Sequence, residues 1–384
     1  MERKIPVGIL GATGMVGQQY VHLLENHPWF EVVYVAASPQ SAGKKYKDAL
    51  RSGWLVAGEL PERVGNLMVE DVSNVEKAAR SCAFVFSAFE LPDKDLIRKY
   101  EEDYAATGMP VFSNASAHRW TEDVPMLIAE INPHHLDIIP AQQKKRGWTK
   151  GFIVVKPNCS LQSYLTPIFA LMKAGYDVEK LIITTLQATS GAGYPGVASL
   201  DMVDNVVPYI GGEEEKSEKE PLKILGEVKG GKFVPYKGIA FSAHCNRVPV
   251  SDGHLACVNI LFGKKKPTRE KILDIWKKFR SEPQELDLPF APLQPIIYRE
   301  EENRPQPKKD RDADKGMAVV VGRLREDNIF DFKFASLSHN TIRGAAGGGI
   351  LNAELAYKKG LLKESVSADG AMAPRKVRAL ASRA

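Results

Sequence analysis

The beginning of the chain contains a strand, a glycine-rich turn and a helix, and this order constrains the fold more than any other feature. Residues 6–10 form a short apolar run, glycines recur in the turn at 11–17, and residues 15–26 carry apolar side chains at helical spacing. A second apolar run at 30–37 predicts the next strand. A βαβ unit of this kind predicts a parallel sheet covered by helices.

The two halves of the chain differ in their strand pattern. Apolar runs at 82–88 and 109–113 continue the parallel sheet, whereas later runs are longer and have fewer helices between them, which favours a mixed sheet. Residues 300–315 are dense in charge and proline and predict a solvated loop. We expect an α/β protein with a Rossmann-type domain at 1–157, a second α+β domain at 158–345, a helix at 346–364 that packs back on the first domain, and a disordered tail at 365–384.

Composition narrows the class of protein. Of the 384 residues, 44% are hydrophobic and 26% charged, as in soluble globular proteins. No apolar run approaches the ~20 residues that span a bilayer, and the net charge of +5 gives no indication of a nucleic-acid partner. The four cysteines show no CxxC spacing, and the chain enters a strand almost at once. We expect a reduced, cytoplasmic protein without a signal peptide, membrane segment or metal site.

The glycine turn predicts a dinucleotide-binding loop. It reads Gly11-Ala12-Thr13-Gly14-Met15-Val16-Gly17, a G-x-x-G-x-x-G pattern between a strand and a helix. Glycines let backbone N–H groups approach a pyrophosphate, and the helix N-terminus favours its charge. We expect contacts to the cofactor from Gly11, Thr13, Gly14, Met15, Val16 and Gly17.

The end of the second strand bears on which dinucleotide binds. NAD-binding folds carry an acidic residue there, on the ribose hydroxyls. This chain instead has hydroxyl and ammonium groups at Ser38, Ser41 and Lys44, which suit a 2′-phosphate and predict NADP. A plain basic turn is the alternative.

One cysteine has a placement typical of a nucleophile. Cys159, in Lys156-Pro157-Asn158-Cys159-Ser160, follows an apolar strand at 151–155 and precedes a helical segment at 161–172. A thiol at a helix N-terminus feels the positive end of the helix dipole, which favours the thiolate. The alternative is a small buried cysteine that fills core space.

Several motifs in order identify a family resemblance. They are the glycine turn, Pro157-Asn158-Cys159, and the segments at 185–196 and 245–255. Together they resemble the aspartate-β-semialdehyde dehydrogenases over about residues 4–362. Segments 113–119, 304–307 and 339–347 are similar to the archaeal and fungal branch. The resemblance implies a Rossmann domain followed by a catalytic and dimerisation domain with a largely antiparallel mixed sheet, as in glyceraldehyde-3-phosphate dehydrogenase.

The resemblance also implies roles for particular residues. Cys159 would be the nucleophile, His254 the general acid/base, and Gln187 the residue that orients the thiol side. Substrate contacts are implied for Arg247 on the α-carboxylate, Glu220 on the α-amino group, and a phosphate set of Arg119, Asn158 and Lys223. Without the family, Glu220 and Lys223 would read as an i, i+3 surface pair on a helix. Further cofactor contacts are implied for Ser87, Ser190, Gly191, Asn340 and Gly347.

The implied reaction is NADP-dependent reduction of L-4-aspartyl phosphate to L-aspartate 4-semialdehyde and phosphate, in lysine, threonine and methionine biosynthesis. The implied assembly is a homodimer or homotetramer. One departure concerns Gln40, which stands where the family commonly has an arginine for the 2′-phosphate. The nearest alternatives are a malonyl-CoA or succinyl-CoA reductase, an N-acetyl-glutamyl-phosphate reductase, and a non-catalytic dinucleotide sensor on the same fold.

Overall fold

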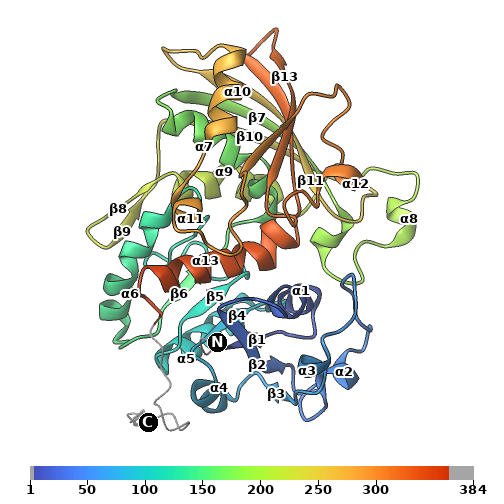
Figure 1. Cartoon of the computed structure of the whole chain (residues 1–384), viewed down its shortest axis with the longest axis vertical. Coiled ribbons are helices and arrows are strands. Elements are labelled where there is room, and N and C mark those ends of the chain that lie inside the picture. The colour runs from blue at the N-terminus through green and yellow to red at the C-terminus, as the bar shows by residue number, and fades with distance from the viewer. Residues whose placement is uncertain (1–3, 363–384) are drawn as a thin grey trace.

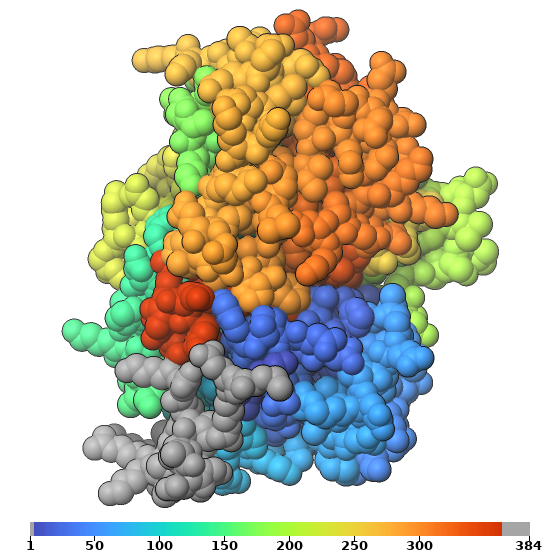
Figure 2. Space-filling view, in the orientation of Figure 1, coloured from blue at the N-terminus to red at the C-terminus, as the bar shows by residue number. Residues whose placement is uncertain are grey.

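Two six-stranded sheets occupy opposite ends of the molecule, and one long helix lies between them. The computed structural model describes residues 4–362, with the first sheet at one end and the second at the other (Figure 1). Helix α13 (Gly347–Lys358) crosses the middle. Figure 2 shows the orange surface of the second half resting on the blue first half. No helix within residues 4–362 is long and apolar enough to cross a membrane.

The first sheet is parallel throughout, with the strand order β3-β2-β1-β4-β5-β6. Its strands are β1 (Ile5–Leu10), β2 (Phe30–Ala37), β3 (Val69–Asp71), β4 (Phe84–Ser87), β5 (Val111–Ser113) and β6 (Ile153–Val155). Apolar side chains such as Val7 and Ile9 are fully buried, because helices cover both faces of a parallel sheet. This order confirms the predicted Rossmann-type sheet, which places ligands beyond the carboxyl ends of its strands.

The helices of the first half connect these strands. They are α1 (Met15–Leu24), α2 (Tyr46–Ala49), α3 (Glu62–Gly65), α4 (Val75–Ser81), α5 (Lys94–Ala106), the 3₁₀ helix η1 (Pro133–Ile138) and α6 (Ile139–Arg146). Helix α5 begins where the side chain of Asp93 accepts hydrogen bonds from the backbone of Asp95 and Leu96, a typical N-cap. This cap fixes the residue at which α5 begins.

The second sheet is mixed, with the strand order β10-β7-β11-β14-β13-β12. Its strands are β7 (Val178–Gln187), β10 (Ala240–Arg247), β11 (His254–Phe262), β12 (Ile296–Arg299), β13 (Val319–Glu326) and β14 (Phe332–Ser338). Within this sheet of the described chain, only the pairs β10–β7 and β12–β13, at the two edges, are parallel. The largely antiparallel sheet is as predicted.

The remaining elements of the second half surround this sheet. They are the 3₁₀ helices η2 (Cys159–Ser163) and η3 (Thr189–Ala192), the helices α7 (Leu165–Lys173), α8 (Ser199–Met202), α9 (Glu213–Ile224), α10 (Arg269–Lys278), α11 (Glu282–Glu285) and α12 (Pro307–Asp310), the hairpin β8 (Glu227–Lys229) and β9 (Lys232–Val234), and a π-helical turn η4 (Ile342–Ala346).

Helix α13 returns to the first half of the chain. It packs against α1 and β5, and side chains such as Ile350 and Leu355 are fully buried there. A Cβ at Gly349 would lie 2.0 Å from the hydroxyl of Tyr20, so only glycine fits at this contact. The expected tail at 365–384 lies outside the described residues.

The segment at 300–315 is largely exposed to solvent, as predicted, but it is anchored at Asp310. Asp310 is buried, and its carboxylate forms ion pairs with Arg304 and Arg299. It also accepts a hydrogen bond from the backbone N–H of Gln306, at 2.7 Å. A dense run of charges can pair with itself, which lets the chain bury part of it.

Candidate active site

Cys159 opens the 3₁₀ helix η2 directly after the first sheet ends. The side chain of Asn158 caps this helix, because its Oδ1 accepts hydrogen bonds from the N–H of Ser160 at 2.8 Å and from the Ser160 hydroxyl at 2.6 Å. The partly exposed thiol faces a cavity of about 530 Å³ between the two halves of the chain. This cavity also receives side chains from α1, β7, α9 and β10.

The thiol is harder to ionise than the sequence predicted. Burial raises the pKa of Cys159 to about 11, and the negative charge of Glu213 adds to this effect. The cationic side chains of Arg119, Arg247 and Lys216 act in the opposite direction. The expectation of a favoured thiolate is corrected, since burial of the thiol and the charge of Glu213 raise its pKa.

His254 lies next to the sulfur. It is the first residue of β11, and its Nε2 lies 3.3 Å from the Sγ of Cys159. Its Nδ1 accepts a hydrogen bond from the backbone N–H of Ala188, at 3.0 Å. Burial, helped by the charge of Arg247, lowers the pKa of His254 to about 3. The ring is therefore neutral and carries its proton on Nε2, facing the sulfur.

A carboxylate with amide partners forms another wall of the cavity. Both oxygens of Glu213, at the start of α9, accept hydrogen bonds from the Asn158 amide, at 2.7 and 2.9 Å. The Gln187 amide donates to Oε2 at 3.2 Å, and the Lys216 ammonium donates to Oε1 at 2.9 Å. Although burial acts to raise it, these partners hold the pKa of Glu213 below its usual value. The cavity thus contains an ionised carboxylate beside an ammonium group.

Two guanidinium groups complete the charged lining. Arg247 ends β10, and its Nη1 donates to the carbonyl of Ala188 at 2.6 Å. Arg119 donates through Nε to the carbonyl of Lys156 at 3.0 Å and through Nη1 to Glu220 at 3.0 Å. Both side chains line the cavity. Guanidinium groups held in this way suit carboxylate and phosphate groups.

The glycine turn lies on the cofactor side of the same cavity. Gly11 has φ +74°, and a Cβ there would lie 2.5 Å from the carbonyl oxygen of Ala88. A Cβ at Gly17 would lie 2.3 Å from the carbonyl oxygen of Gly11, so this turn requires glycine at both places. Met15 and Val16, at the start of α1, line the cavity. The turn and the helix N-terminus therefore fit the pyrophosphate of a dinucleotide.

The residues predicted to bind the 2′-phosphate of NADP lie in the turn after β2. Ser38 donates to the side-chain oxygen of Gln40 at 3.2 Å, and the Lys44 ammonium donates to the Gln40 carbonyl at 3.1 Å. Ser41 is buried in the same turn. Gln40 thus ties the turn together, and the exposed ammonium of Lys44 remains the cation of the set.

Comparison with known proteins agrees with this geometry. Two family models match, described as the NAD-binding domain of semialdehyde dehydrogenase at residues 6–139 and its dimerisation domain at 168–343. An aspartate-semialdehyde dehydrogenase of Methanothermobacter thermautotrophicus is 47% identical over 91% of this chain and 98% of the relative. That of Archaeoglobus fulgidus is 45% identical over 93% and 99%. The chain belongs to the aspartate-semialdehyde dehydrogenase family.

A solved structure of the family matches the fold closely. Aspartate semialdehyde dehydrogenase with NADP from Candida albicans has a TM-score of 0.85 and 40% identity, over 94% of this chain and all of that chain. An aspartate semialdehyde dehydrogenase II from Vibrio cholerae has a TM-score of 0.71 at 23% identity, which shows the shared fold.

Within this family framework, two predicted substrate residues do not reach the cavity. The carboxylate of Glu220 pairs with Arg119 and accepts the backbone N–H of Asn158 at 2.7 Å. The ammonium of Lys223 donates to the carbonyls of Arg119, Thr121 and Val124 at 2.7, 3.3 and 2.8 Å. The prediction that these two side chains contact substrate is therefore corrected. They brace the loops that carry Arg119 and Asn158.

Sequence reasoning missed the pair that does face the cavity. Glu213 and Lys216 line it and have the same i, i+3 spacing as Glu220 and Lys223, two helical turns earlier on α9. Residues 213–220 are rich in acidic side chains, and charge alone does not show which of them bind a ligand. The signal that could have found the pair is the repeated Glu-x-x-Lys spacing in this run.

Two predicted cofactor residues are also placed away from the cavity. The hydroxyl of Ser87 is fully buried and donates to Glu101 at 2.6 Å. A Cβ at Gly347 would lie 2.8 Å from the sulfur of Met317, so this glycine permits close packing instead. Gly344 lines the cavity in its place. Neither residue lines this cavity, and their contacts with the cofactor stay predictions.

The other three predicted cofactor residues do border the cavity. The amide of Asn340 donates to the Ser190 hydroxyl at 2.8 Å, and its Oδ1 accepts the N–H of Gly253 at 2.8 Å. A Cβ at Gly191 would lie 3.1 Å from the ring of His254. Ser190, Gly191 and Asn340 are therefore joined to the turn that leads into His254.

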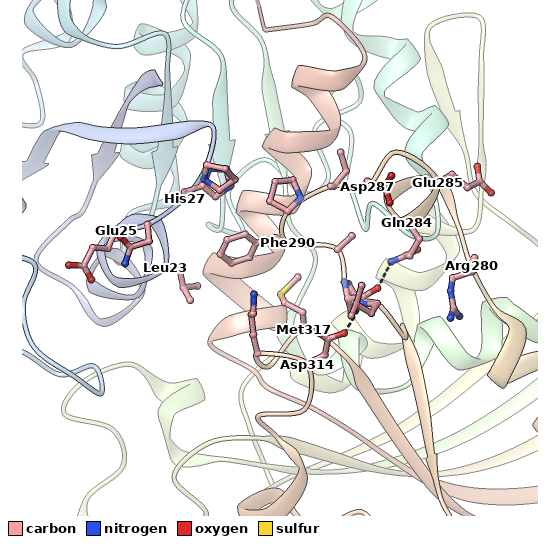
Figure 3. A pocket seen from close by; sticks show the side chains of 18 of the residues that line it. Leu23, Glu25, His27, Arg280, Gln284, Glu285, Asp287, Phe290, Asp314 and Met317 are labelled. Carbon is pink, nitrogen blue, oxygen red and sulfur yellow. Dashed lines mark hydrogen bonds between the residues drawn. The ribbon is translucent and has the colours of Figure 1, made fainter. Parts of the chain in front are cut away.

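A larger cavity, of about 910 Å³, lies elsewhere (Figure 3). It opens between the end of α1 and residues 280–293, and its wall includes His27 stacked on Phe290. The Nε2 of His27 lies 2.7 Å from the buried carboxylate of Glu354. No cysteine is among the residues that line this cavity, and size alone does not identify the active site.

Proposed function

We propose that this chain reduces L-4-aspartyl phosphate to L-aspartate 4-semialdehyde and phosphate, with NADPH, through a thioester at Cys159. The observation that carries the proposal is the 3.3 Å contact between Sγ of Cys159 and Nε2 of His254 at the cavity shared with the glycine turn. The relatives that match along the chain are named aspartate-semialdehyde dehydrogenase.

The charges of the cavity match the charges of this substrate. Arg247 is the partner for the α-carboxylate, and the ionised Glu213 is the partner for the α-ammonium group. Arg119 and Lys216 supply positive charge for the phosphate, with the amide of Asn158 beside them. A thioester of coenzyme A has no ammonium group for Glu213 to bind, which favours aspartyl phosphate over malonyl-CoA or succinyl-CoA.

The first chemical step forms the thioester. Sγ bonds to the acyl carbon, the bond from that carbon to the phosphate oxygen breaks, and phosphate leaves with the electron pair. The thiol proton leaves on the phosphate, because His254 has a pKa of about 3 and its Nδ1 is occupied by the N–H of Ala188. Arg119 and Lys216 stabilise the departing charge.

The second step reduces the thioester. NADPH, when bound, supplies a hydride ion to the acyl carbon. The N–H of His254 then faces the developing negative charge on oxygen and sulfur as a fixed donor. Breaking of the carbon–sulfur bond releases the aldehyde and returns the electron pair to Sγ, and a proton from water restores the thiol. In place of the general acid/base role expected from the sequence, we propose that His254 acts chiefly as a hydrogen-bond donor with a fixed tautomer.

Assembly through the second half of the chain is part of the proposal. The light-green segment around α8 projects from the surface (Figure 2) and exposes Leu200 at 88% and Tyr209 at 68%. Monomeric proteins seldom expose such apolar side chains together. A matched family model is described as a dimerisation domain. We expect a homodimer or homotetramer by light scattering, and a monomer at micromolar concentration would contradict this.

The cellular setting follows from the proposed reaction. The product would enter lysine, threonine and methionine biosynthesis. The four cysteines are free thiols in the described chain, which supports a reducing, cytoplasmic compartment.

The test is phosphate-dependent reduction of NADP⁺ by L-aspartate 4-semialdehyde. We expect turnover that requires phosphate and that is slower with NAD⁺. Equal turnover of malonyl-CoA with NADPH would contradict the proposed substrate. Equal turnover with NAD⁺ would contradict the role of Ser38, Ser41 and Lys44.

A further inference from the structure

Lys156 is a buried amine that the proposed mechanism does not use. It follows β6, lies three residues before Cys159, and is only 3% exposed. Its Nζ donates to the carbonyl of Arg343 at 3.1 Å. A Cβ at Gly348 would lie 2.3 Å from this Nζ, so the amine packs against the first turn of α13. Lys156 therefore connects two segments. One is β6, which leads to the nucleophile, and the other is the turn that begins α13.

The segment held by Lys156 is the one that packs against the nucleophile. Gly344 follows Arg343, and a Cβ at Gly344 would lie 2.8 Å from the Cβ of Cys159. Movement of the Arg343 backbone would therefore change the wall against which Cys159 rests. The single hydrogen bond from Lys156 acts directly on that backbone.

A small cavity lies at the same place. Lys156, Gln162, Arg343 and Glu130 line it, and the centre of a water-sized sphere can occupy about 10 Å³ of it. This volume is about that needed for one water molecule. Lys156, which follows β6, reaches Gly348 at the start of α13, so the cavity lies between these two elements.

Hydrogen-bond donors around this cavity lack acceptors. Gln162 and Arg343 are only 2% and 1% exposed, yet Nε2 of Gln162 and Nε of Arg343 have no hydrogen-bond partner within residues 4–362. The other nitrogens of Arg343 donate to Glu130, at 3.0 and 2.5 Å. Buried donors are costly without a partner, so one water molecule in the cavity, which can accept two hydrogen bonds, would stabilise Gln162 and Arg343.

The charges around Lys156 couple it to the thiol. Burial lowers the pKa of Lys156 to about 7, and the cations Arg343 and Arg119 act in the same direction. The Cys159 thiolate and the carboxylate of Glu130 oppose this and favour the ammonium form. Because the coupling is mutual, an ammonium at Lys156 also favours the thiolate.

We propose that Lys156 is a positioning residue for Cys159: with one water molecule held between Lys156, Gln162 and Arg343, it fixes the Arg343–Gly344 turn against the nucleophile and places positive charge behind the sulfur. This inference rests on the proposed function only in that Cys159 is the nucleophile. Lys156 does not line the substrate cavity and acts through the backbone and the field that it supplies.

The test compares Lys156→Met with the control Lys150→Met, whose side chain is exposed. The readout is the pH profile of Cys159 alkylation by iodoacetamide, followed on the Cys159 peptide by mass spectrometry. Because Lys156 is an ammonium only below a pH of about 7, its loss should slow alkylation about tenfold at pH 6, with a smaller effect at pH 9. The control should match the unaltered protein, and kcat should fall more than KM changes. An unchanged alkylation profile in Lys156→Met would overturn the proposal.

Two further measurements cover misfolding and the water. Gln162→Leu keeps the lysine and removes one donor, so it should shift the alkylation profile in the same direction by a smaller amount. No shift in this variant, where Lys156→Met does not fold, would overturn the proposal. A high-resolution crystal structure should show one density peak within hydrogen-bond distance of Lys156 and Gln162, and a cavity without density would also overturn it. A shifted alkylation profile in a protein that lacks semialdehyde activity would refute only the proposed function.

Discussion

The two ends of helix α9 carry the same pair of residue types and do different work. Glu213 and Lys216 lie at its start, and Glu220 and Lys223 lie seven residues later, with equal spacing. The first pair lines the cavity beside Cys159. The second pair is buried, with its charges directed at Arg119 and at backbone carbonyls.

The difference shows that the spacing of residues along a helix determines which face they share. The packing around each part of the helix determines what that face contacts. Seven residues are about two helical turns, so both pairs lie on one side of α9. The start of the helix meets the open cavity, whereas its end meets the loop that carries Arg119 and residues 121–124. The first pair therefore lies where a charged ligand can reach it, and the second pair holds the protein's own groups in place.

The largest expected effect is that substitution of Glu213 lowers activity, whereas substitution of Glu220 lowers stability. Glu213→Gln should lower kcat/KM for the semialdehyde about a hundredfold, because the substrate ammonium loses its partner and its position. Glu220→Gln breaks a buried ion pair and should cost ~3 kcal/mol of stability. Steady-state kinetics and thermal unfolding of both variants measure this. Equal loss of activity with no loss of stability in Glu220→Gln would contradict the comparison.

The two lysines are expected to differ in the same way, with Lys216 affecting phosphate binding and Lys223 affecting stability. Lys216→Met should raise the KM for phosphate about tenfold or more, since a cation at the phosphate site is lost. Lys223→Met should leave that KM within about twofold and lower the midpoint of thermal unfolding, because three carbonyls lose their donor. Phosphate titrations at saturating semialdehyde test this. A phosphate effect confined to Lys223→Met would reverse the assignment of the two ends.

A smaller effect concerns the reactivity of the thiol. The charge of Glu213 raises the pKa of Cys159, so Glu213→Gln should speed alkylation at pH 8 a few-fold while activity falls. Glu220→Gln, at the buried end, serves as the matched comparison and should have less influence. Slower alkylation in Glu213→Gln would show that Glu213 acts on the thiol mainly by holding Asn158 in place.

The smallest effect is a pH dependence of stability from the buried end. Burial lowers the pKa of Lys223 to about 8, below the value of about 10.4 expected in the unfolded chain. Between these values the unfolded chain binds more protons, so this group makes the protein more stable as pH rises. The difference in unfolding midpoint between the unaltered protein and Lys223→Met should widen from pH 7.5 to pH 10. A gap that narrows would contradict the burial of this ammonium.

Much of the fold was predictable because its signals are local. The turn at 11–17 needs glycine for close backbone contacts, and the apolar runs around it formed β1 and β2 as expected. Strand β10 was missed because its residues include polar side chains such as His244 and Asn246 and alternate between buried and exposed positions. Its partner β7 lies sixty residues earlier in the chain, so no pattern within a short stretch of sequence predicts that the two strands pair.

The site was predictable to the level of segments, and less so for side-chain direction. Cys159, His254, Gln187, Arg247 and Arg119 meet at one cavity, although they come from distant parts of the chain. The direction of the Ser87 side chain was not predictable, because alternate residues of a strand face opposite sides, and its hydroxyl meets Glu101 on the buried side. The thiol pKa was misjudged because burial depends on the assembled cavity.

The most direct test of the account is to trap the acyl group. Protein mixed with L-aspartate 4-semialdehyde and NADP⁺ in the absence of phosphate should release about one NADPH per active site in a rapid burst. Mass spectrometry of the acid-quenched protein should find an aspartyl group on the peptide that contains Cys159. Continued turnover without phosphate and without an adduct, or an adduct on another residue, would contradict the account.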